Sequence, residues 1–137
     1  MRNFLFSMLA AVLILTAASP KADEPAPAIQ SVIERQLAAF QANDLDRAFT
    51  FAAPTIQKMF GDPQNFGRMV QQGYPMVWRP ARYEMMQLVQ TTSGPVQVVL
   101  FEDAAGTLHE AGYLMKKVNG VWRIAGVHIR KRPGVGA

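Results

Sequence analysis

The sequence predicts an α+β fold in which N-terminal helices pack on a curved antiparallel sheet of about four strands, giving a cone-like domain. Apolar residues in the first half of the chain recur at spacings of three and four, which is typical of amphipathic helices. After residue 80, runs rich in valine, leucine and aromatic residues alternate with turn residues, which is typical of strands. Because the helices precede the strands in separate blocks, an α+β architecture is favoured over an alternating α/β one.

The helices are defined by their apolar spacing and by their end residues. Asp44 is expected to cap a second helix, and Asp62 followed by Pro63 is a typical helix start. Gly61 and Gly73 are expected to end the two segments that precede them. The predicted helical segments are 29–40, 44–52, 54–61 and 62–73.

The strands are separated by recognisable turns. Asn119-Gly120 suits a two-residue hairpin loop, in which both residues need positive φ. Ser93–Pro95 and Ala104–Gly106 are expected to form the other turns. The predicted strands are 83–90, 96–102, 108–118 and 121–129.

The hairpin loop predicts which side chains oppose each other across the last two strands. Counting outward from the loop, the expected partners are Val118 and Val121, Lys117 and Trp122, Met115 and Ile124, Tyr113 and Gly126, and Ala111 and His128.

This register gives the sheet an aromatic face and an aliphatic face. The aromatic face would hold Phe101, Tyr113, Trp122 and both histidines, and would pack under the helices and partly line a pocket. Alternatively, helix side chains fill that space. The aliphatic face would be an unusually apolar surface for a monomer, so we expect it to form a homodimer.

The N-terminus has the order of a secretory signal peptide, with a basic start, an apolar centre and a small-residue exit. The apolar run is too short for a membrane span, so no permanent membrane anchor is expected. The predicted organisation is a signal peptide over 1–22, one domain over 23–132 and a flexible tail over 133–137. The predicted location is periplasmic or secreted.

Composition excludes several classes of function. The 137-residue chain has no cysteine, which excludes a disulfide scaffold, a thiolate zinc site and a cysteine nucleophile. Its formal net charge is +4. Cleavage after residue 22 removes Arg2 and Lys21, which leaves 12 basic against 10 acidic residues. Three of those basic residues lie in Arg130–Arg132, so no nucleic-acid partner is expected.

Three segments resemble a known superfamily. Ile29–Ile33, Ala48–Pro54 and Asn119–Val127 look like parts of the cone-shaped nuclear-transport-factor-like fold. That superfamily includes ketosteroid-isomerase-like and polyketide-cyclase-like enzymes and many binding domains. The resemblance therefore implies a fold but no single activity.

A closer resemblance lies in the middle of the chain. Phe60–Phe66, Met69–Pro75 and Trp78–Pro80 resemble an exported bacterial family of unknown function. The resemblance covers most of the predicted mature chain and implies no particular chemistry.

The segment from Gly73 to Pro80 is the strongest candidate for a binding loop. Arg79 beside Trp78 and Tyr74 could hold a carboxylate or phosphate in an aromatic-walled mouth. The alternative is a helix-to-sheet joint in which Arg79 bonds backbone carbonyls. With the residues of the aromatic face, the predicted ligand-binding residues are Tyr74, Trp78, Arg79, Tyr113, Trp122 and His128.

No residue is predicted to be catalytic, and no metal or cofactor is expected. His109 and His128 lack an obvious third ligand for zinc. We expect non-catalytic binding of a small apolar or amphipathic ligand, or of a protein partner. The alternatives are a pocket enzyme of isomerase or cyclase type, using a histidine or carboxylate with Tyr113, and a purely structural homodimeric module.

Overall fold

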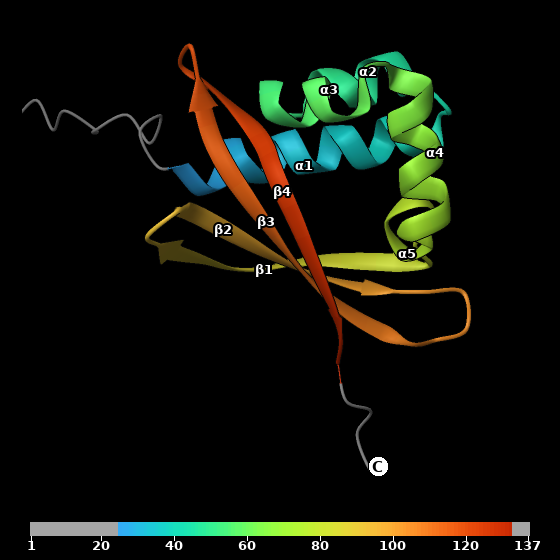
Figure 1. Cartoon of the computed structure of the whole chain (residues 1–137). Coiled ribbons are helices and arrows are strands. Elements are labelled where there is room, and N and C mark those ends of the chain that lie inside the picture. Colours follow the sequence, from blue (N-terminus) through green and yellow to red (C-terminus); the bar gives the residue numbers. More distant parts are fainter. Residues whose placement is uncertain (1–24, 133–137) are drawn as a thin grey trace, which may run out of the picture.

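A computed structural model describes residues 25–132, in which helices cover one face of a four-stranded antiparallel sheet (Figure 1). The predicted α+β class is therefore confirmed. The predicted signal peptide and the predicted tail lie outside the described residues. The elements are α1 (Pro25–Gln41), α2 (Leu45–Thr50), α3 (Pro54–Phe60), α4 (Pro63–Gly73), α5 (Pro75–Trp78), β1 (Arg82–Thr91), β2 (Gly94–Glu102), β3 (Leu108–Val118) and β4 (Val121–Lys131).

The helix starts follow from the capping residues that the sequence shows. The Asp44 side chain accepts from the Arg47 N–H, and the Asp62 side chain accepts from the Asn65 N–H at 2.7 Å. Gly61 ends α3 with a φ of 81°, a conformation that favours glycine.

One helix is missing from the prediction. Pro75–Trp78 forms the short helix α5 in the segment expected to be a loop, whereas α4 ends at Gly73 as predicted, with Tyr74 as its C-cap residue. Pro75 occupies the first helical position, where its missing N–H needs no partner.

The sheet has the order β1-β2-β3-β4, and each strand pairs with its neighbour in the chain. Asn119 and Gly120 both have positive φ, as the predicted hairpin loop requires. Phe101 pairs with His109 across β2 and β3, so these two residues share one face of the sheet, as predicted.

The predicted register of the last hairpin is wrong beyond its first few pairs. A β-bulge shifts the pairing after Met115 and Ile124, so that Tyr113 pairs with Val127 instead of Gly126. Ala125 has no partner in the register. His128 therefore pairs with Gly112, not Ala111, and lies on the opposite face of the sheet from the predicted one.

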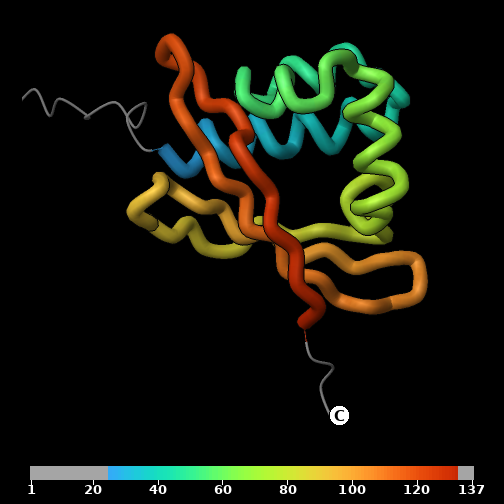
Figure 2. The backbone as a smooth tube through the Cα atoms, viewed as in Figure 1, coloured from blue at the N-terminus to red at the C-terminus, as the bar shows by residue number. Residues whose placement is uncertain are grey.

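The bulge occurs where β4 receives a second neighbour. Ile124 donates its N–H to Phe51 O and accepts from the Ala53 N–H, both at 2.8 Å. The segment between α2 and α3 thus forms a short bridge to β4 (Figure 2). This contact brings the helices against the edge of the sheet beside the bulge.

The core lies between the helices and the face of the sheet that carries Phe101, Tyr113 and Met115. From α1, the fully buried Ile29, Ile33 and Leu37 are among the side chains that fill it. The buried Phe101 and Tyr113 belong to the predicted aromatic face, which accordingly packs under the helices. Within residues 25–132, no helix has the length and apolar character needed to cross a membrane.

Candidate functional site

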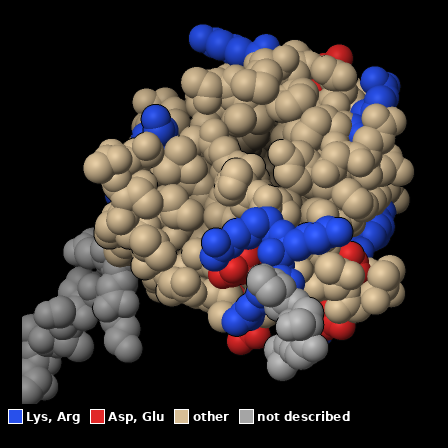
Figure 3. Space-filling model, turned by 60° about the horizontal axis from the view of Figure 1, so that its bottom comes forward, with Lys and Arg blue, Asp and Glu red and all other residues tan. Residues whose placement is uncertain are grey.

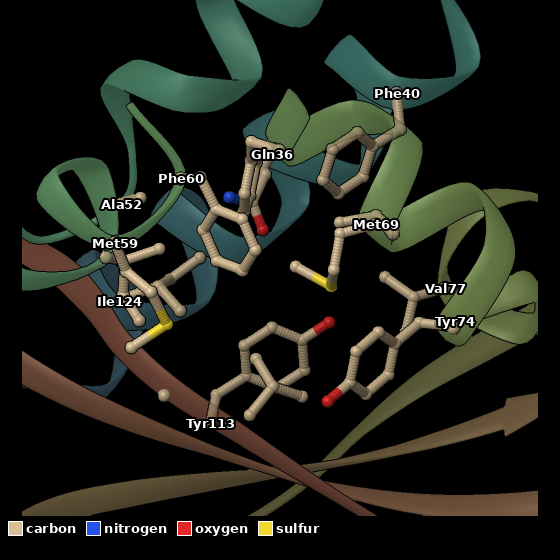
Figure 4. A pocket seen from close by; sticks show the side chains of 16 residues that line it. Gln36, Phe40, Ala52, Met59, Phe60, Met69, Tyr74, Val77, Tyr113 and Ile124 are labelled. Atoms are coloured by element: carbon tan, nitrogen blue, oxygen red, sulfur yellow. The ribbon is translucent and has the colours of Figure 1, made fainter. Parts of the chain in front are cut away.

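A cavity of about 430 Å³ lies between the helices and the β3–β4 hairpin (Figure 4). Its size is within the range of ligand pockets. Figure 3 shows a hollow in the surface bordered by uncharged residues. The lining residues are Gln36, Phe40, Ala52, Ile56, Met59, Phe60, Phe66, Met69, Val70, Gly73, Tyr74, Val77, Tyr113, Ile124, Gly126 and Val127.

The lining is almost entirely apolar, and no charged side chain of the described residues belongs to it. Met59 and Met69 contribute side chains that are flexible and can change the shape of the wall. A few polar atoms face this surface, as is usual in small-molecule sites. They come from Gln36, Tyr74 and Tyr113.

The Tyr113 hydroxyl is the most unusual polar atom of the cavity. It is buried and lacks a hydrogen-bond partner among the described residues. Burial also raises the pKa of Tyr113, so that the phenol stays neutral and remains a hydrogen-bond donor. Buried hydroxyls are normally paired, so the lack of a partner for this one is unusual.

Gln36 is a buried residue of α1, and within its side chain only the nitrogen forms a hydrogen bond with another described residue. Its Nε2 donates to Ala48 O at 3.1 Å, which ties α1 to α2. Its side-chain oxygen points toward the cavity in Figure 4. The cavity therefore offers both a hydrogen-bond donor and an acceptor.

Two of the predicted site residues, Tyr74 and Tyr113, line the cavity. Arg79 does not line the cavity. Its guanidinium bonds backbone carbonyls, as in the alternative prediction of a helix-to-sheet joint. It donates to Phe40 O at 2.7 Å, Trp78 O at 2.8 Å and Asn43 Oδ1 at 2.9 Å. The guanidinium also lies over the Trp78 ring, so both residues are engaged in joining α5 to the end of α1.

Trp122 and His128 also lie away from the cavity lining. Lys117 covers the Trp122 ring near the hairpin loop. His128 is exposed beyond the bulge and lines a shallow groove on the outer face of the sheet. The predicted combination of His128 with Tyr113 on one face is therefore not formed.

The other histidine, His109, is buried and anchored. Its Nε2 lies 2.8 Å from Asp103 Oδ2, and Asp103 Oδ1 accepts from the N–H groups of Ala105 and Thr107. The His109 hydrogen bond and these N–H groups lower the pKa of Asp103. Among the described residues, no group of three or more His, Asp or Glu is arranged to hold a metal.

A second, more open hollow of about 470 Å³ adjoins the mouth of the cavity. Gly73, Tyr74 and Val127 line both spaces. Its remaining lining residues are Met76, His109, His128, Ile129 and Lys131.

Sequence reasoning missed most of the cavity wall, because its residues come from the helices. Phe60, Met69 and Gln36 fit an ordinary buried helix face, and nothing in their spacing separates a cavity wall from packed core. One signal was present in Gln36, a polar residue on the apolar side of α1.

A family model matches residues 22–137, which is most of the chain. The chain belongs to the family described as Domain of unknown function (DUF4864). No curated protein and no solved structure matches it. The family match agrees with the predicted resemblance to a family of unknown function, whereas the nuclear-transport-factor-like relationship stays a prediction.

Proposed function

We propose that this DUF4864 protein is an exported binding protein that holds a small apolar or amphipathic molecule in the cavity, without catalysis. The apolar cavity of about 430 Å³, with the unpaired Tyr113 hydroxyl in its wall, carries this proposal. Apolar lining with a small number of oriented polar groups is the usual composition of a small-molecule site.

Binding is favoured over proton-transfer chemistry by the lining itself. Within residues 25–132, the cavity wall has no carboxylate and no imidazole, the groups that most often act as general bases. An isomerase-type site would need such a group opposite Tyr113. His128 lies on the other face of the sheet, which removes the base that the sequence suggested.

Export rests on the sequence of residues 1–22 and is tested separately. We expect the protein recovered from the periplasm or medium of its own host to begin within residues 19–23. N-terminal sequencing checks this, and a mature protein that retains Met1 would contradict export by cleavage.

Fluorescence of N-phenylnaphthylamine, a neutral apolar dye, tests ligand binding. Its emission rises when it enters an apolar site, so we expect a saturable increase with the purified protein. Val127→Phe adds an aromatic ring to the cavity wall and should abolish most of that increase. Val121→Phe is the matched control, since Val121 is exposed at the start of the same strand.

A saturable increase that both variants retain would mean that the dye binds elsewhere. No increase with any apolar probe would contradict the proposed function. Retained secondary structure by circular dichroism shows that each variant is folded.

A further inference from the structure

The β-bulge in β4 decides which side chains of that strand face the cavity and its mouth. Before the bulge, Ile124 faces the helices. After it, Val127, Ile129 and Lys131 pair with Tyr113, Ala111 and His109, all of which are buried on the helix side. Because directly paired residues share a face, this side of β4 changes from apolar to basic toward its end.

The same change occurs along the connected spaces. The cavity is lined by Ile124 and Val127, and the adjoining hollow is lined by Val127, Ile129 and Lys131. Tyr74 lines both and stands at their junction. A molecule that extends from the cavity past Tyr74 into the hollow therefore reaches Lys131.

The hollow has a basic character that is not neutralised by its own lining. Within the described residues no carboxylate lines it, and Lys131 takes part in no ion pair. The neighbouring Arg130 differs, because its guanidinium bonds Glu110 at 3.0 Å on the outer face. Figure 3 shows Lys and Arg side chains below the hollow in the surface, with Asp and Glu side chains among them.

His109 adds a second nitrogen base to this lining. Asp103 holds its Nε2, so the ring is fixed in position next to the strand partner Lys131. Because Nε2 is already bonded to Asp103, the neutral imidazole has no further N–H for an anion, and the ammonium group of Lys131 is the donor that suits one.

We propose that the ligand is a single-chain amphiphile with an anionic head group, its apolar chain in the cavity and its head beside Lys131. This inference rests on the proposed function. It adds the charge of the ligand's head group and the orientation of the ligand in the cavity. The chain displaces water from apolar surface, while the head stays in the open hollow and avoids the cost of burying a charge.

Three probes that share one alkyl chain test the sign of the head-group charge. Decanoate, decanol and decylamine compete for the N-phenylnaphthylamine site at neutral pH, below their micelle concentrations. We expect decanoate to bind roughly fivefold more tightly than decanol, the upper range for one exposed ion pair, and decylamine to bind most weakly. Added salt should reduce the decanoate advantage.

Lys131→Gln should remove most of the preference for decanoate and leave decanol binding unchanged. Lys117→Gln makes the same change of charge at the far end of the hairpin, beside Trp122, and should keep the preference. Lys131→Glu should reverse it in favour of decylamine.

Equal binding of the three probes, or a decanoate preference that survives Lys131→Gln, would overturn the head-group inference and leave ligand binding intact. Absence of dye binding and of binding by every probe would overturn the proposed function itself. The two failures are therefore distinguishable.

Discussion

The hydroxyl of Tyr113 contributes nothing to the fold that a phenyl ring would not contribute. A buried hydroxyl without a partner loses its hydration and gains no bond in return. We therefore expect Tyr113→Phe to raise the free energy of unfolding by about 1 kcal/mol, measured by urea denaturation. A decrease of similar size would show that the hydroxyl has a partner in the free protein and would remove this support for a ligand contact.

Arg79 has the opposite character, since it acts in the fold and not in the cavity. Its planar guanidinium reaches Phe40 O and Asn43 Oδ1 together, a geometry that an ammonium group cannot reproduce. Arg79→Lys should lower the free energy of unfolding by about 1–2 kcal/mol. Arg68→Lys, at an exposed position of α4, is the control and should have little effect. Equal effects of the two substitutions would contradict this role.

Asp103 is expected to make the free energy of unfolding depend on pH in the acidic range. Its pKa is lowered in the folded state, chiefly by the hydrogen bond from His109, so the folded chain keeps it charged where the unfolded chain protonates it. The resulting stabilisation is present above the ordinary pKa of 3.8 and is lost as the pH falls through the lower folded-state value. In urea unfolding from about pH 6 to about pH 3, Asp103→Asn should show a smaller loss of stability than the native chain. Parallel curves would count against the link.

Among the helices and strands, the sequence predicts the helix starts and the hairpin turn, but it does not predict the strand register beyond a β-bulge. Capping residues and the Asn119-Gly120 loop act locally, so the helix starts and the hairpin turn follow from a few neighbouring residues. The bulge at Ala125 lies beside the hydrogen bonds of Ile124 with Phe51 and Ala53, which are far away in the sequence. A register counted from the loop alone does not include the bulge, and for that reason it places His128 on the wrong face.

A second bulge, in β1, has its own polar support. The pairing of β1 with β2 shifts between Met85 and Leu88. Gln97 is fully buried opposite this shift, and its Nε2 donates to Met86 O at 2.9 Å and to Val98 O at 3.0 Å. The side chain thus satisfies a carbonyl group at the irregular part of the ladder.

We expect Gln97→Leu to destabilise the fold by about 2 kcal/mol, because it leaves the partly buried carbonyl oxygens of Met86 and Val98 without that donor. Gln30→Leu is a useful comparison, since Gln30 only contacts Gln97 Oε1 at 3.5 Å and should matter much less. The measurement is urea denaturation of both variants. A neutral Gln97→Leu would show that the bulge does not need this side chain.

At the scale of the whole molecule, the cavity results from the way the helices pack on the sheet. The sequence identifies the apolar faces of α1, α4 and the sheet, but the volume between them depends on α5 and on the β4 bulge, which it does not reveal. Tyr74 and Tyr113 could be predicted as lining residues because one lies in a segment that contains two prolines and the other lies on the buried strand face. Met59 and Phe60 could not, since they resemble any other helix core position.

A domain that keeps this space open should gain stability when a ligand fills it. A ligand that binds only the folded state, present at a hundred times its dissociation constant, stabilises that state by about 2.7 kcal/mol. Thermal unfolding with saturating N-phenylnaphthylamine should therefore occur at a higher temperature than without it. Val127→Phe occupies part of the space with its own ring and should lose this ligand-dependent increase, whereas Val121→Phe should keep it. An equal increase in both variants would place the stabilising site outside the cavity, because only one of the two substitutions changes the cavity wall.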